Sequence, residues 1–338
     1  KGSILDDDQV VEGMEILTKE GLQVENQIEK SAQVMAEVDR VISKFKPLGR
    51  DSREIFVLLE RLHNLLFLYE FSSNFFMKIL EKVLSATAKV TNEVSEERIA
   101  NLKKQLYIEV SARVSRALTL EDKMVFNILL ANLFKGCNMQ KSSDLSIGDI
   151  AAYIEEVFGA NFPWQGRGLD YLQQVTEQEI DSTTPLLFCS APGHDVSERI
   201  EEMARTGGKD LAAVAMGTEE GYATAEKILS SAAKQGSWVM LKNCHYCTEW
   251  LQEILVKRLH ALSPHSNFRI FLTSEINPKL PISLLRMSDL ILAEAPGGVK
   301  ASLSRFFKNI SADRFKVPVI NRLYFLLSWI HSVIQERL

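Results

Sequence analysis

Short apolar runs alternate with helical patterns through the second half of the chain. Each run is four to six residues long. Apolar and polar residues do not alternate within it, as they would in a half-exposed strand, and such continuous runs are typical of strands buried on both faces of a parallel sheet. Five strands alternating with helices predict a three-layer α/β domain with a parallel sheet. The expected strands are Leu186–Cys189, Leu211–Met216, Trp238–Leu241, Phe268–Thr273 and Leu290–Ala293.

The stretch Gly236–Arg286 shows this pattern most clearly. A buried strand is followed by Thr248 at a helix N-cap position, then by an amphipathic helix, a second strand and a short helix ending at Arg286. The short connection predicts parallel strands joined right-handedly. The apolar face of the connecting helix consists of Trp250, Leu251, Ile254, Leu255 and Leu259.

The first half begins with a heptad pattern instead. Apolar residues follow each other at alternating spacings of four and three, with Gly21 and Ser31 at the two vacant positions. This predicts a coiled-coil seam of about 50 Å, although a long helix lying on a globular core is an alternative. The narrow stripe and largely polar flanks favour a coiled-coil arm whose partner helix lies elsewhere. The seam residues are Val10, Met14, Leu17, Val24, Ile28, Met35, Val38, Ile42 and Phe45.

Pro47 and Gly49 are expected to end this first helix. Ser52 then caps a segment to about Leu84 that is apolar nearly all round, which indicates burial in a helical bundle. Two further helices are expected at 98–118 and 120–134, with Thr119 and Asp122 as a variant of the capping box at the start of the second.

The segment 135–147 has no apolar period and is rich in Gly, Asn, Ser and Lys, so it predicts a boundary. The expected division is an arm helix (1–50), a helical bundle (51–134), a linker (135–147), the α/β domain (148–316) and the start of another helical unit (317–338).

Composition narrows the function classes. The chain has 338 residues, 46% hydrophobic and 25% charged, which fits a globular protein with a sizeable core. Its net charge of −5 gives no overall attraction to nucleic acid or anionic membranes, and no apolar run is long enough to span a bilayer. Four cysteines are too few for a disulfide scaffold, which favours a reducing cytosolic setting. The chain begins at Lys1 and stops within a helical pattern, so a fragment of a longer protein is expected.

Ligands of a parallel sheet bind where its strands end, so these turns are the candidate pocket. An ATPase needs GxxxxGKS or GxxxxGKT after the first strand, and acids after a later strand to hold magnesium. This chain has SAPGHDVS and LKNCH there, so both halves of an ATPase site are missing. The degenerate pocket is expected to comprise Ser190, Gly193, His194, Asp195, Asn243, Thr273 and Asn277.

Other chemistry is weakly supported. Cys244 and Cys247 form a CxxC motif, but no second pair completes a zinc site, and no metal is expected. Ser190, His194 and Asp195 are too close along one turn for a hydrolase triad. Arg286 is placed to point at a neighbouring subunit's phosphates, although an ordinary surface ion pair is the simpler interpretation.

Several long stretches of the chain are distinctive, among them TTPLLFCSAPGHD, GSWVMLKNCH, LHALSPHSNFRIFLTSEINPKLPISLLR and RLYFLLSWIHSVIQERL. In sequence and in order, and over nearly the whole chain, they closely resemble the dynein heavy chain, a microtubule motor with six AAA+ modules in one polypeptide. LSPHSNFR with TSEINPKLP looks more like the cytoplasmic branch than the axonemal one.

The resemblance implies that residues 1–134 end the fifth AAA+ module, with the arm as one helix of the strut that props the microtubule-binding stalk. Residues 147–307 would form the large domain of the sixth module, which does not hydrolyse ATP. Thr273 to Asn277 would occupy the sensor-one region, and Arg286 the arginine-finger position facing the fifth module.

The same resemblance implies no cofactor in this segment, with ATP and Mg in other modules. Expected partners are the stalk, the neighbouring AAA+ modules, dynein accessory chains and, through the parent chain, microtubules in the cytoplasm; neither nucleic acid nor membrane insertion is expected. The links at 135–147 and 316–318 are shorter than in the family. The alternatives are a stand-alone coiled-coil scaffold with a degenerate AAA+ domain and an ATPase with an unusual pocket.

Overall fold

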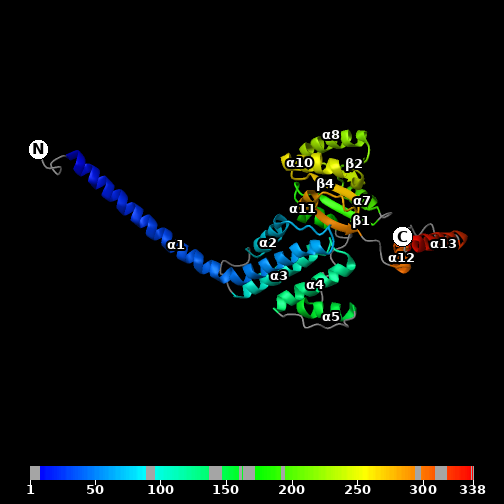
Figure 1. Cartoon of the computed structure of the whole chain (residues 1–338), viewed down its shortest axis with the longest axis horizontal. Coiled ribbons are helices and arrows are strands. Elements are labelled where there is room, and N and C mark those ends of the chain that lie inside the picture. Colours follow the sequence, from blue (N-terminus) through cyan, green and yellow to red (C-terminus); the bar gives the residue numbers. More distant parts are fainter. Residues whose placement is uncertain are drawn as a thin grey trace.

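A computed structural model describes residues 8–88, 96–136, 147–159, 162, 172–191, 195–293, 298–308, 318–335 and 337. Within these ranges a long helix projects from a helical bundle, and the bundle lies against an α/β domain (Figure 1). The structure confirms the predicted fold class of a parallel α/β domain preceded by an all-helical region. No described helix is long and apolar enough to cross a membrane.

The projecting helix α1 runs from Asp8 to Arg61 without a break. The prediction that Pro47 and Gly49 end it was wrong, as was the prediction that Ser52 caps the next helix, because Ser52 lies inside α1 and is buried. A proline inside a helix costs about 3 kcal/mol. Burial of Leu48, Ile55 and Leu59, each 0–5% exposed, stabilises by about 1.5–3 kcal/mol per side chain and outweighs that cost.

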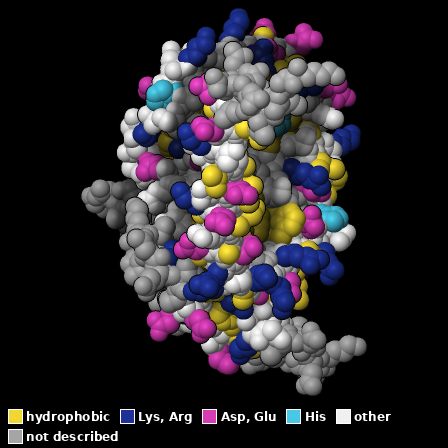
Figure 2. All heavy atoms as spheres, turned by 90° about the vertical axis from the view of Figure 1, so that its left-hand side faces the viewer, with side chains coloured by type: hydrophobic (Ala, Val, Ile, Leu, Met, Phe, Trp, Pro, Cys, Tyr) yellow, Lys and Arg dark blue, Asp and Glu magenta, His cyan; other side chains and the backbone are white. Residues whose placement is uncertain are grey.

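The outer part of α1 is an arm that projects away from the bundle (Figure 1). Its described side chains from Glu12 to Lys44 are exposed, apart from Gly13, and Phe45 is the first seam residue that packs against the core. The flanks are less polar than predicted, because Ile16, Leu22, Val34 and Val41 are also exposed. Figure 2, which faces the arm side of the molecule, shows apolar, acidic and basic side chains interspersed there.

The bundle consists of the inner end of α1 and helices α2 to α5. Their bounds are α2 Ser73–Ala88, α3 Glu96–Val114, α4 Leu120–Lys135 and α5 Ile147–Phe158. The expected single apolar segment from Arg53 to Leu84 is interrupted, because α1 ends in a 3₁₀ turn, Leu62–Asn64, and a non-helical stretch precedes α2. The side chain of Ser72 starts α2 by accepting a hydrogen bond from the backbone N–H of Phe75, at 3.2 Å.

The predicted cap of α4 is present. Thr119 Oγ1 accepts a hydrogen bond from the backbone N–H of Asp122 and donates one to its carboxylate. The buried hydroxyl of Tyr69 completes the group: it donates to Asp122 at 2.6 Å and accepts from the backbone N–H of Thr119 at 3.0 Å. Helix α5 packs against α4, with Tyr153 donating to Asn132. The domain boundary expected near residue 147 stays a prediction.

All five predicted strands form one parallel sheet. They are β1 Leu186–Ser190, β2 Leu211–Ala215, β3 Trp238–Lys242, β4 Arg269–Glu275 and β5 Asp289–Ala293, in the order β2-β3-β4-β1-β5. In register, Leu186 on the β1 strand lies between Phe271 and Asp289 on its neighbours.

Helices cover both faces of the sheet, as the three-layer prediction requires. One face packs on α8 Glu219–Gln235, α11 Ile282–Met287 and a continuous helical run formed by α9 Thr248–Trp250, a π-helical turn η6 Leu251–Leu255 and α10 Val256–Ala261. The other packs on α7 Ser197–Thr206 and on α6 Leu172–Gln174 with the π-turn η4 Val175–Glu179. Two helices follow the sheet, α12 Val299–Lys308 and α13 Pro318–Gln335.

Two details of the connecting helix differ from expectation. Cys247 is its N-cap and Thr248 its first residue, and the helix contains a π-helical turn that the apolar spacing does not reveal. Four of the five residues of the predicted apolar face are buried, with Leu251 and Leu255 fully so, and Ile254 is partly buried. Gly236 ends the preceding helix α8 in the left-handed conformation, at φ 79°, as expected for a glycine there.

Candidate functional site at the strand ends and the junction

The carboxyl ends of the parallel strands meet at one edge of the sheet. Ser190, Lys242 and Glu275 are the last residues of β1, β3 and β4. A 3₁₀ turn, η5 Cys244–Tyr246, follows β3 and lies against β4. The described residues of the predicted pocket therefore lie at or near this edge.

Three of the predicted pocket residues surround the turn after β3. Asn243 has a φ of 59°, the left-handed region that non-glycine residues rarely adopt, and its backbone N–H donates to Thr273 Oγ1 at 3.3 Å. The Asn277 side chain donates to the carbonyl oxygen of His245 at 3.4 Å. These bonds hold the ends of β3 and β4 together, with the Thr273 hydroxyl as an acceptor and the Asn277 amide as a donor.

The remaining predicted residues lie around the first strand. Ser190 is buried and its carbonyl accepts a hydrogen bond from the backbone N–H of Ile276. Asp195 accepts from the backbone N–H of Ser197 at 2.8 Å, at the start of α7. Gly193 and His194 lie outside the described residues. Ser190 and Asp195 thus accept hydrogen bonds from the backbone of the chain itself.

The end of β3 carries a cation where an ATPase would hold magnesium with acids. Lys242 Nζ lies 2.6 Å from Glu201 Oε1 of α7, so its charge is already compensated within the chain. At the end of β4, the backbone N–H of Glu275 donates to His245 Nδ1 at 3.1 Å. The sequence does not indicate the pairing of Lys242 with Glu201, because the two residues are far apart along the chain.

The CxxC cysteines are buried within this edge. Cys247 donates to the carbonyl of Cys244, and Cys244 to that of Leu241, both at 3.4 Å. The hydrogen bond with Cys247 and burial raise the pKa of Cys244, and burial raises the pKa of Cys189 to about 12. No cluster of three or more His, Cys, Asp or Glu side chains among the described residues is arranged to hold a metal ion.

Arg286 makes an ion pair within the chain. Its Nε lies 2.9 Å from Glu70 Oε2, in the loop before α2, and the arginine side chain is 61% exposed against 14% for the glutamate. The bond therefore ties the α/β domain to the bundle. This agrees with the simpler interpretation of a structural ion pair, and it leaves the arginine-finger role a prediction.

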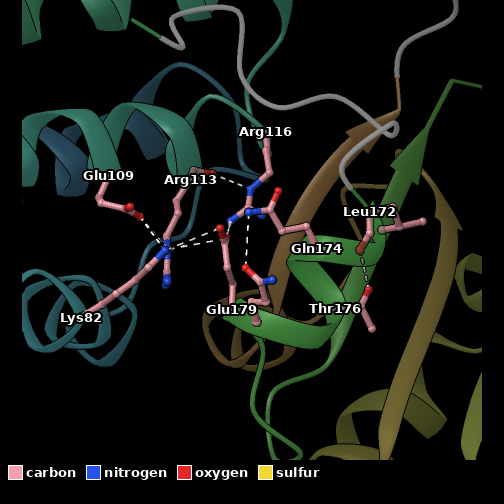
Figure 3. Close-up of polar contacts among 9 residues, drawn as sticks. Lys82, Glu109, Arg113, Arg116, Leu172, Gln174, Thr176 and Glu179 are labelled. Carbon is pink, nitrogen blue, oxygen red and sulfur yellow. Dashed lines mark hydrogen bonds and ion pairs between the residues drawn. The ribbon is translucent and has the colours of Figure 1, made fainter. Parts of the chain in front are cut away.

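A buried cluster of charges forms the rest of this junction (Figure 3). Arg113 of α3 and Arg116 of the turn after α3 flank Glu179 of η4, and all three side chains are 4–5% exposed. The closest pair is Arg116 Nη2 to Glu179 Oε2, at 3.0 Å. Lys82 of α2 and Glu109 of α3 extend the cluster with an ion pair of 2.9 Å.

The junction also joins backbone to sheet. The backbone N–H of Leu292 on the edge strand β5 donates to the carbonyl oxygen of Arg116 at 2.9 Å, so the turn after α3 covers this edge. Lys78 of α2 adds an ion pair to Asp181 at 2.7 Å and a hydrogen bond to Thr184 at 2.7 Å. Bundle and α/β domain also share one apolar core, which includes Leu106 and Leu292.

Sequence reasoning missed the junction. Arg113 and Arg116 stand three residues apart among small and apolar residues, which is a usable sign of buried charge. Glu179 gives no comparable sign, because its partners lie more than sixty residues away along the chain.

Comparison with known proteins decides the family. Residues 181–292 match the family described as Dynein heavy chain region D6 P-loop domain. The whole chain aligns with the cytoplasmic dynein heavy chains of Drosophila melanogaster, at 28% identity, and Dictyostelium discoideum, at 30%. The chain belongs to the dynein heavy chain family. The chain is also similar to cytoplasmic dynein 2 heavy chain 1 of Chlamydomonas reinhardtii, at 42% identity. That alignment covers 49% of this chain and 4% of the Chlamydomonas protein.

The dynein heavy chains are far longer than this chain, which spans 9% of the Drosophila and Dictyostelium proteins. The Dictyostelium alignment extends over 447 positions, more than the 338 residues of the chain, so that relative carries extra residues within the span. This agrees with the sequence-based expectation that some links are short, without showing which ones.

Proposed function

We propose that this chain is a non-catalytic mechanical segment of a dynein motor ring. In this proposal, the arm of α1 receives the movement of the ring, driven by ATP at other modules, and passes it to the microtubule-binding stalk. The observation that carries the proposal is the continuity of α1, which runs from an exposed apolar arm into a bundle fastened to the sheet. A lever needs a stiff rod on a rigid base, and this arrangement supplies both.

The exposed seam supports a coiled-coil partner outside the described chain. Met14, Leu17 and Met35 are 58–68% exposed, and a helix with such a stripe gains stability by burying it against another helix. The stalk and the neighbouring AAA+ modules are the proposed partners. Through the parent chain, microtubules and dynein accessory chains join them, and the proposed location is the cytoplasm, on the cytoskeleton.

The strand ends support the non-catalytic part of the proposal. Lys242, held by Glu201, stands where magnesium would need an acid, and Asn243 and Thr273 are bonded to each other. ATP and Mg are therefore assigned to other modules of the parent protein. We further propose that residues 1–134 form the last part of the fifth AAA+ module and that residues 148–316 form the large domain of the sixth.

The test places a charge on the seam of a complete dynein motor. Val24→Asp with Ile28→Asp puts two carboxylates into the proposed contact, while Asn26→Asp adds a carboxylate to the same turns outside the seam. The seam variant is expected to lose the dependence of microtubule affinity on nucleotide state and to keep its basal ATP turnover. The Asn26 variant is expected to keep both. Normal coupling in the seam variant would refute the lever.

A further inference from the structure

A small polar cavity lies at the junction between bundle and α/β domain. Its volume is about 30 Å³, and side chains from both units line it. Lys78 and Arg113 come from the bundle, and Glu179, Ser288 and Asp289 from the α/β side. None of these residues is part of the strand-end pocket.

Two buried hydrogen-bond donors that line the cavity have no hydrogen-bond partner among the described residues. One is Arg113 Nε, whose nearest carboxylate oxygens, on Glu179 and Glu109, lie 3.8 and 3.9 Å away, too far for a hydrogen bond. The other is Ser288 Oγ. A buried donor that bonds to nothing is costly, so groups of this kind in native proteins commonly bind an ordered water or ion.

The charges around the cavity decide between a water and an ion. Lys78 is paired with Asp181, and Arg286 with Glu70. The remaining buried ionisable groups are Arg113 and Arg116 against Glu179 and Asp289, two bases and two acids. Burial raises the pKa of Asp289, an effect that the charges of Arg116 and Arg113 oppose. An anion or a cation would upset this balance in a site of low dielectric, whereas a neutral molecule that both donates and accepts would not.

We propose that the cavity binds one ordered water molecule, which accepts a hydrogen bond from Arg113 Nε and bonds to Ser288 Oγ. A cavity needs about 10–15 Å³ to hold a water, so the volume suffices. The hydrogens of this water are then available to the carboxylate of Asp289, the first residue of β5. The water links α3 to the start of the edge strand. This site is independent of the lever proposed above and stands if that proposal fails.

A crystal structure of the 338-residue chain tests the site, with crystals grown in sodium bromide and data collected at the bromine absorption edge. The expected result is an oxygen-sized peak within hydrogen-bonding distance of Arg113 Nε and Ser288 Oγ, without anomalous signal. An anomalous peak there would show a halide site and overturn the proposal. A closed cavity, with Arg113 Nε bonded directly to a protein acceptor, would also overturn it.

A pair of variants gives a second measurement. Ser288→Ala removes one partner of the water, and Ser304→Ala removes the same group from an exposed position on α12. The Ser288 variant is expected to lower the thermal unfolding midpoint by roughly 2 °C relative to the Ser304 variant. Equal midpoints would contradict a bound water held by Ser288.

Discussion

The arm of α1 and the junction between bundle and sheet place their side chains in opposite ways. The arm leaves Leu17, Val24 and Ile28 more than half exposed, while the junction buries Arg113, Arg116 and Glu179. Apolar groups in water and charges in the interior are both unfavourable without partners. The junction pairs its charges with each other, whereas the apolar side chains of the arm stay exposed among the described residues. The arm is therefore the surface on which we propose that another helix packs.

The largest effect on stability is expected from breaking the junction. Glu179→Ala leaves two buried guanidinium groups without their shared carboxylate, and removal of one partner from a buried ion pair costs about 3–5 kcal/mol. Urea unfolding of the chain measures the loss. Glu177→Ala, an exposed position in the same short helix, is the control and is expected to change stability by less than about 0.5 kcal/mol. Equal losses in both variants would mean that the buried cluster contributes no special stability.

The two ends of α1 give the next contrast. Leu59→Ala leaves a cavity in the bundle and is expected to cost about 2–5 kcal/mol, because Leu59 is fully buried. Ile28→Ala lies on the exposed arm and is expected to change the unfolding free energy by less than about 0.5 kcal/mol. Urea unfolding of the two variants compares them directly. A large loss for Ile28→Ala would show that the chain already buries its seam in solution.

Within the junction, a much smaller effect than that of Glu179→Ala is expected at its exposed edge. Arg286→Ala removes an ion pair whose arginine is 61% exposed, and pairs of this kind contribute at most about 1 kcal/mol. The unfolding free energy of this variant is therefore expected to lie close to that of the parent chain. A loss as large as that of Glu179→Ala would mean that Arg286 is a principal fastening between the two units.

Much of the fold was predictable because its signals are local. Each strand is a continuous apolar run such as Trp238–Leu241, and Thr119 caps α4 through bonds that span three residues. Pro47 misled the prediction because tertiary burial of Leu48, Ile55 and Leu59 outweighs the local preference of proline.

The candidate site likewise has one part that the sequence predicts and one part that it does not. Asn243, Thr273 and Asn277 were predictable because they lie at the ends of parallel strands, which meet at one edge of the sheet. The structure brings these three residues together there. The junction depends on pairs such as Arg116 with Glu179, which only the folded chain brings into contact. No spacing rule along the sequence contains that information.

The central claim is that the arm and the α/β domain move as one rigid piece. Spin labels attached through Gln33→Cys on the arm and Lys227→Cys on α8 report their separation in a complete dynein motor by pulsed electron paramagnetic resonance. The account predicts a single narrow distance distribution that is the same with ATP bound and without nucleotide. A distribution that broadens or moves between the two states would show that α1 bends or that the junction opens, and would contradict the lever.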